Sequence, residues 1–132
     1  MKISVNKPCP CGSKMKYKLC CQKYHKGAKA KDALTLMKSR YTAYAVGDAK
    51  YIIKTTHLEN PEFQEDKQAW QKSIENFCKE NSFLGLEIES YEQEKEYAFV
   101  AFKAYFAEGA LYEKSRFVQN KGFWYYLDGK IK

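Results

Sequence analysis

Residues 9–21 have the sequence CPCGSKMKYKLCC and contain four of the five cysteines of the chain. Cys9 and Cys11 flank a single residue, so one tight turn can present both thiols. Cys20 and Cys21 follow after eight residues and supply two more sulfur atoms. Four thiolates are the ligand set of a structural zinc site, which requires a tetrahedron of soft donors. The stretch therefore predicts a Zn²⁺ site with Cys9, Cys11, Cys20 and Cys21 as its ligands.

Other chemistries also use clustered cysteines. A disulfide framework needs an oxidising compartment, but residues 1–7 contain no apolar run that could act as a signal peptide, and five cysteines is an odd number. Iron–sulfur clusters are held by four thiolates, and copper(I) is bound by paired sulfurs. These remain alternatives to zinc, which we favour. Reduced thiols predict a cytoplasmic protein.

The basic residues are concentrated around the cysteines. Residues 1–31 contain nine lysines and no acidic residue, so the net charge of +7 arises from +9 in this segment and −2 in residues 32–132. Cationic neighbours lower the pKa of a thiol and favour the thiolate that metals bind. The segment has too few apolar residues for a core of its own, so we expect it to be disordered without a metal.

Lysines with interleaved aromatic side chains suit two classes of partner. The candidate contact residues lie inside the cysteine stretch and are Lys14, Lys16, Tyr17 and Lys18. They suit RNA or a ribosome surface, through phosphate contacts and base stacking. They equally suit an acidic protein surface. A solvated basic segment that binds nothing specific is the remaining interpretation.

The cysteine stretch resembles a known module. CPCGS, followed by Lys16-Tyr17-Lys18 and the pair Cys20-Cys21, is similar to the SEC-C motif, a zinc-binding module named from the C-terminus of the SecA translocation ATPase. The resemblance implies zinc as the metal and an acidic protein, such as a chaperone or secretion factor, as the partner. Lys14 departs from the glycine that many members carry after the serine. We assign residues 1–27 to this module.

Residues 28–132 are predicted to form an α+β domain. Helices are expected over 33–46, from Asp48 to about His57, and over 66–81, with aspartates at their starts. From residue 83 the hydrophobic period changes to two, and turn residues occur near 92–95, 108–109, 121–122 and 128–129. Helices followed by strands indicate about three helices packed on one face of a curved antiparallel sheet of about four strands.

The helix predicted over 33–46 has one broad apolar face. At 100° per residue, Ser39 and Thr42 fall on the opposite, polar face. Arg40 falls inside the apolar arc, where an unpaired charge is costly, so it must reach water or find a partner. Cys78, on the apolar stripe of the third helix, is expected to be a core thiol.

The resemblance extends beyond the cysteines. LMKSRYTAY at residues 36–44, TTH at 55–57, EKSRF at 113–117 and WYYLDG at 124–129 look like the YchJ family. Membership implies a cone-shaped domain of the nuclear-transport-factor-2-like, or cystatin-like, kind behind the zinc knuckle. The family brings no assigned activity.

A cone of this kind can hold a cavity between its helices and its sheet. The polar residues expected to line it are Arg40, Tyr41, His57, Glu113, Ser115 and Asp128. In one interpretation His57 is a general base and Glu113 orients it, in a small-molecule-binding protein or an acid–base enzyme. In the other, Arg40 and Glu113 form a structural ion pair. We favour the second, because isolated His and Glu residues are not a catalytic signature, and we expect a binding module rather than an enzyme.

The composition also bears on whether the chain enters a membrane and whether it associates with itself. No run approaches the about 18 consecutive apolar residues of a membrane span, so no membrane association is expected. The outer face of the predicted sheet is rich in tyrosine and is a candidate surface for a homodimer. The tyrosines expected there are Tyr105, Tyr112, Tyr125 and Tyr126.

Overall fold

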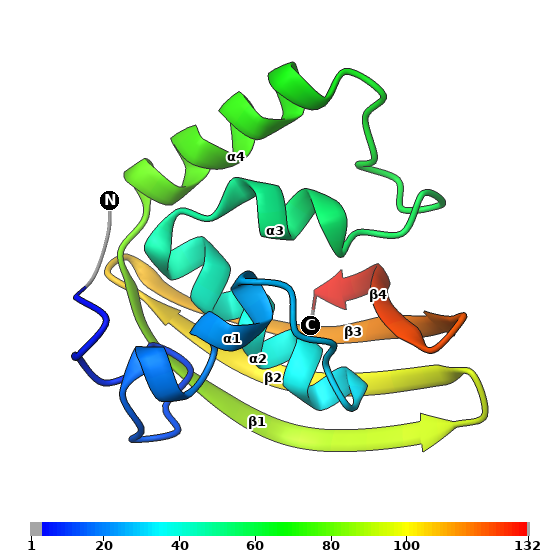
Figure 1. Cartoon of the computed structure of the whole chain (residues 1–132), viewed down its shortest axis with the longest axis horizontal. Coiled ribbons are helices and arrows are strands. Elements are labelled where there is room, and N and C mark those ends of the chain that lie inside the picture. Colours follow the sequence, from blue (N-terminus) through cyan, green and yellow to red (C-terminus); the bar gives the residue numbers. More distant parts are fainter. Residues whose placement is uncertain (1–3, 132) are drawn as a thin grey trace.

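The computed structural model of the chain describes residues 4–131. A curved antiparallel sheet of four strands, paired in sequence order, carries helices on one face (Figure 1). The strands are β1 (Phe83–Glu94), β2 (Tyr97–Phe106), β3 (Gly109–Asn120) and β4 (Phe123–Ile131). The helices over the sheet are α2 (Ala33–Val46), α3 (Ala49–Lys54) and α4 (Lys67–Glu80). The predicted α+β class, with three helices on a curved antiparallel sheet, is confirmed.

An aspartate caps the start of each of these three helices. The side chains of Asp32, Asp48 and Asp66 accept a hydrogen bond from the backbone N–H three residues ahead, at 2.7, 3.1 and 3.0 Å. Such bonds satisfy one of the backbone donors that the first turn of a helix leaves without a partner. At its other end α2 stops at Gly47, whose φ of 81° is favourable only for glycine. Local capping therefore explains why the helix starts could be predicted.

One predicted turn is wrong. Asp128 and Gly129 pair within β4, opposite Arg116 and Ser115 of β3. The Asp128 carboxylate accepts two hydrogen bonds from the Arg116 guanidinium, at 2.6 and 3.0 Å, so a cross-strand ion pair overrides its turn propensity. A Cβ at residue 129 would collide with the carboxylate of Glu113, so a larger residue there would require that side chain to move.

The amino-terminal segment is built around the cysteines and lies beside α2 (Figure 1). It contains two short helices, η1 (Tyr17–Leu19) and α1 (Gln22–His25). We call residues 4–27 the knuckle and residues 28–131 the cone. The sequence predicted domains over residues 1–27 and 28–132. Residues 1–3 and residue 132 lie outside the described part of the chain. That division stays a prediction, because the two parts share a buried contact surface.

This contact surface corrects the expected orientation of α2. Ser39 and Thr42, which periodicity placed on the polar face, are both 0% exposed. The knuckle covers them: the Cys9 sulfur lies 3.6 Å from the Thr42 hydroxyl, and the His25 imidazole lies 2.8 Å from the Ser39 carbonyl oxygen. α2 is therefore buried on both sides, against the sheet and against the knuckle.

The main hydrophobic core fills the space between the helices and the inner face of the sheet. Phe117, Ile52 and Val100 are among its largest fully buried side chains. Cys78 belongs to this core, as predicted, and burial, assisted by the charge of Glu75, raises the pKa of its thiol to about 11. Within residues 4–131, no helix is long and apolar enough to cross a membrane.

The outer face of the sheet carries fewer of the expected tyrosines. Tyr105 and Tyr112 flank Lys103, whose ammonium lies 4.9 and 4.6 Å from their ring centroids. Tyr126 instead lies on the inner face, opposite the buried Phe117. Its assignment to the outer face was wrong, because residues that pair directly across two strands share one face of the sheet.

Candidate metal centre

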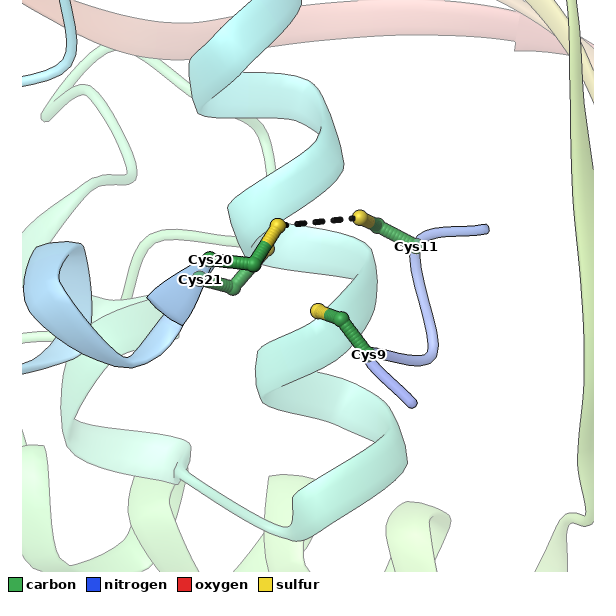
Figure 2. Close-up of side chains that lie close together, drawn as sticks. All are labelled: Cys9, Cys11, Cys20 and Cys21. Carbon is green, nitrogen blue, oxygen red and sulfur yellow. Dashed lines mark hydrogen bonds between the residues drawn. The ribbon is translucent and has the colours of Figure 1, made fainter. Parts of the chain in front are cut away.

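Two turns bring the four cysteines together. Cys9 and Cys11 lie on a turn closed by a hydrogen bond from Gly12 N–H to the Cys9 carbonyl oxygen (3.1 Å), with Gly12 at a φ of 87°. Cys20 and Cys21 connect η1 to α1. Figure 2 shows the two pairs facing one another beside α2. The two cysteine pairs thus lie on two separate turns, and the surrounding backbone holds these turns in place.

The sulfur atoms form a compact group. All four lie within 4.8 Å of one another, and Cys11 and Cys20 are 3.6 Å apart. Four sulfurs bound to one zinc ion at about 2.3 Å would be separated by about 3.8 Å. Cys9, Cys11 and Cys21 are buried and Cys20 is half-buried, and none of the five cysteines is in a disulfide. The four cysteines can therefore hold a metal ion.

The electrostatics of the thiols favour a cation at this position. Hydrogen bonds from Cys11 and Cys21 lower the pKa of the Cys9 thiol. Hydrogen bonds to Cys11 and Cys9, together with burial, raise the pKa of Cys21. The pKa of Cys11 is lowered by its bond to Cys21, but its bond to Cys9 and burial raise it to about 11. A cation among the sulfurs would offset the raised pKa of Cys11 and Cys21 and favour their thiolates.

A polar chain connects the knuckle to α2. The Tyr17 hydroxyl lies 2.7 Å from Nδ1 of His25, and Nε2 of His25 donates to the Ser39 carbonyl oxygen at 2.8 Å. The imidazole also packs against the Tyr51 ring, with 4.7 Å between centroids. Sequence reasoning treated Tyr17 as a partner-contact residue, and these contacts of Tyr17 and His25 were not predicted. The only available signal was their position beside the cysteines.

The predicted partner-contact residues divide into two groups. Lys14, Lys16 and Lys18 are exposed. Tyr17 is 7% exposed, and burial raises the pKa of its hydroxyl to about 12, so this ring cannot stack on a partner in this structure. The correction has a simple cause: η1 turns the Tyr17 side chain inward, where it packs with the cysteines.

The polar residues predicted to share a cavity also divide. Arg40, Tyr41, Glu113 and Ser115 line a cavity of about 730 Å³ between the helices and the sheet. His57 and Asp128 are not among the residues that line it. Asp128 pairs with Arg116, as described above.

His57 follows the end of α3 and is held by backbone contacts. Its N–H donates to the Tyr126 carbonyl oxygen at 2.9 Å, and its Nδ1 accepts from the Glu59 N–H at 3.0 Å. The structure therefore gives no geometric support to His57 as a general base that Glu113 orients or that acts on a ligand in the cavity.

The expected ion pair between Arg40 and Glu113 is not formed. Within the described residues, no ion pair joins them at 4.0 Å or less. Nη1 of Arg40 instead donates to three oxygens at the end of α3, which belong to Ile52, Thr55 and Thr56 (3.1, 2.7 and 3.1 Å). Strand periodicity placed Glu113 on the correct face, but it could not supply the distance across the cavity.

Comparison with known proteins agrees with both parts of the chain. A family model described as "YchJ, middle NTF2-like domain" matches residues 32–129, and a SEC-C motif model matches residues 6–23. A UPF0225 protein of Enterobacter sp. (strain 638) is 42% identical over 128 residues, which cover 92% of this chain and 81% of that protein.

Two solved structures are similar over nearly the whole chain. A SEC-C motif containing protein from Psychrobacter arcticus has a TM-score of 0.80 at 33% identity, covering 97% of this chain and 84% of that one. RPA3114, a SEC-C motif containing protein from Rhodopseudomonas palustris, has a TM-score of 0.78 at 30% identity, covering 94% and 98%. With an NTF2-like domain that follows a SEC-C motif, the chain belongs to the YchJ family.

Proposed function

We propose that the chain is a zinc-binding protein whose knuckle contacts an acidic protein surface. The observation that carries the metal is the group of four thiols within 4.8 Å, three of them buried. Zinc suits it because a closed tetrahedron of four thiolates is a structural zinc site, which leaves no coordination position for a substrate. The role of the ion is then to fix the shape of the knuckle.

The proposal for zinc is tested on reduced, freshly prepared protein. We expect native mass spectrometry and elemental analysis to find one zinc ion per chain, and none after Cys20 and Cys21 are both replaced by serine. Iron or copper in place of zinc, or a folded knuckle without any metal, would contradict it.

The exposed surface of the knuckle combines positive charge with apolar side chains. Lys14, Lys16 and Lys18 are exposed, and Met15 and Leu19 between and beside them are 50% and 58% exposed. Protein interfaces combine an apolar centre with a charged rim, and complementary charge accelerates their association. Base stacking on RNA requires accessible aromatic rings, and Tyr17 is buried. These observations support an acidic protein over RNA or a ribosome surface.

The partner class is tested by charge reversal with a matched control. Lys16→Glu/Lys18→Glu changes the knuckle, and Lys72→Glu/Lys79→Glu makes the same charge change on exposed positions of α4. In a pull-down from cytoplasmic extract read for protein and RNA, we expect only the first variant to lose an acidic protein that the wild type captures. Ribonuclease should not release that protein. Release by ribonuclease, or equal capture by both variants, would contradict the proposal.

Two further expectations belong to this proposal. Zinc thiolates persist where thiols stay reduced, which supports a cytoplasmic location.

Self-association through the outer face of the sheet stays a prediction, supported by Tyr112, which is 37% exposed, and by Tyr105 beside it. Sedimentation measurements of wild type and Tyr112→Glu would test it: a monomeric wild type would contradict it.

A further inference from the structure

The cavity of the cone has an apolar part and a polar end. Its volume is about 730 Å³, within the range of small-molecule sites. Aromatic rings from all sides form the apolar part, among them Trp70 and Phe77 of α4 and Phe83 and Phe106 of the sheet. Phe77 is 44% exposed although it packs on Phe83 and Tyr44, at centroid distances of 6.1 and 5.7 Å. The walls thus suit a flat apolar group.

A guanidinium lies at the polar end without a carboxylate partner. Arg40 is 7% exposed, and in the described residues all of its recorded hydrogen bonds come from Nη1. The Tyr126 ring lies 4.7 Å from its Cζ atom. Arg40 lines the cavity, and no hydrogen bond of Nε or Nη2 is recorded within residues 4–131. They can donate to an anionic group there.

A carboxylate lies at the same end on the opposite wall. The Oε2 atom of Glu113 accepts from the Ser115 hydroxyl at 2.6 Å and from the Tyr126 hydroxyl at 3.1 Å. Burial and the charge of Glu113 raise the pKa of Tyr126, which keeps its hydroxyl protonated as a donor. These two donors fix the carboxylate, and Oε1 has no recorded protein partner in residues 4–131. Glu113 can therefore accept from a cationic group of a ligand.

No ion pair at 4.0 Å or less joins the two charges in the described residues, yet both contact Tyr126. A ligand with only a carboxylate would pair with Arg40 but would be repelled by Glu113. An amine without a carboxylate would pair with Glu113 but would be repelled by Arg40. Glu62 at the exposed rim adds a further negative charge that disfavours a net anion. Only a ligand with both charges pairs both groups.

We propose that this cavity binds a small zwitterion of the amino acid class with a large aromatic side chain. Its carboxylate lies at Arg40, its ammonium at Glu113 and its ring against Trp70. The inference is independent of the metal and of the partner of the knuckle, because none of the cavity residues belongs to residues 4–27.

The test uses three probes that share an indole ring and differ in their charged groups. They are tryptophan, indole-3-propionate, which lacks the ammonium, and tryptamine, which lacks the carboxylate. Binding to the full chain is followed by nuclear magnetic resonance of ¹⁵N-labelled protein. The two tryptophans serve as reporters, because Trp70 lines the cavity and Trp124 does not. We expect tryptophan to shift the Trp70 indole signal but not that of Trp124. Each single-charge probe should bind at least about tenfold more weakly, as the loss of one charged hydrogen-bonded contact predicts.

Two variants assign the charges. Glu113→Gln keeps the size of the side chain and should weaken tryptophan about tenfold without weakening indole-3-propionate. Arg40→Met should weaken tryptophan but not tryptamine, and its fold is checked by the amide spectrum. If Arg40→Met fails to fold, because Arg40 also holds the end of α3, the Glu113→Gln series decides alone. Equal binding of all three probes, an equal loss in Glu113→Gln, or no shift of Trp70 at millimolar tryptophan would overturn the proposal.

Discussion

The knuckle and the cone are stabilised in different ways. The small core of the knuckle consists of three buried cysteines and Tyr17, with the half-buried Cys20 beside them. The core of the cone contains large apolar side chains from every helix and strand of that part. Burial of apolar area stabilises the cone without any ligand. The knuckle has no comparable area to bury, so we expect its order to depend on a metal ion held by the thiols.

The contact between the two parts combines hydrogen bonds with ring packing, since the His25 imidazole packs on the Tyr51 ring and Tyr24 packs against the core of the cone. Its hydrogen bonds are made to α2, where Thr42 contacts the Cys9 sulfur and the Ser39 carbonyl oxygen contacts His25. The hydrogen bonds of this contact orient one part on the other and contribute only about 1 kcal/mol each. We therefore expect each part to respond to mutation largely by itself, and the predictions below test this from the largest effect to the smallest.

The largest effect is expected from removing two ligands. Cys20→Ser/Cys21→Ser should abolish zinc binding and with it about 10 kcal/mol or more of stabilisation of the knuckle. The knuckle should then be disordered, while the amide signals of the cone and its indole signals persist. Cys78→Ala is the control, because it removes a buried thiol of the cone and should retain zinc. Complete unfolding of the double variant would show that the cone also depends on the metal.

The reciprocal change tests the cone. Trp70 is 6% exposed in the core, and Trp70→Ala should lower the free energy of unfolding by about 3–5 kcal/mol, because it removes a large apolar side chain and leaves a space. Urea unfolding followed by circular dichroism measures the loss. Zinc content at low urea should equal that of the wild type. Loss of zinc in the folded variant would mean that the packing of α4 is transmitted to the knuckle.

A smaller effect is expected at the contact between the parts. Thr42→Val keeps the shape of the side chain but removes the hydroxyl that lies 3.6 Å from the Cys9 sulfur. Hydrogen bonds to metal ligands change metal affinity by about 10–100-fold, so zinc should bind about tenfold more weakly in a chelator competition. Thr35→Val, on the same helix but half-exposed, is the control. Equal affinities for the two variants would remove Thr42 from the support of the site.

The difference between the knuckle and the cone also explains which features could be predicted from the sequence. Capping residues, the two hydrophobic periods and the cysteine spacing are local signals, and they predicted the helix starts, the four strands and the sulfur group. The burial of Ser39 and Thr42 was not predicted, because helical periodicity assigns one buried face and a second part of the chain covers the other. Tyr17 was misassigned for a different reason, since the core of the knuckle is too small to produce a periodic pattern.

The polar end of the cavity shows the other limit. Strand periodicity correctly placed Glu113 and Ser115 on the inner face, and helical periodicity placed Arg40 among apolar residues. Periodicity shows which face of an element a residue lies on, but it does not give the distance between a helix and a sheet. Whether Arg40 pairs with Glu113 could therefore not be decided from the sequence. His57 lies beyond the end of α3, where no period applies and where a hydrogen bond to β4 fixes its direction.

The smallest effect concerns the backbone of the knuckle itself. Lys14 has a φ of 71°, in the left-handed region that costs a side-chain-bearing residue about 1–2 kcal/mol. Lys14→Gly removes this strain, partly offset by the greater freedom of glycine in the unfolded chain. Because folding of the knuckle and metal binding are one process, a net gain of about 1 kcal/mol should appear as about fivefold tighter zinc binding.

The control for this change lies two residues away. Lys16 has a φ of −63° and a ψ of 146°, so glycine relieves no strain there and only adds freedom to the unfolded chain. Lys16→Gly removes the same charge and should weaken zinc binding slightly. Opposite signs for the two variants, measured by chelator competition at one ionic strength, separate backbone geometry from charge. Equal weakening would mean that the lysine charges, rather than the turn, govern the zinc affinity of the knuckle.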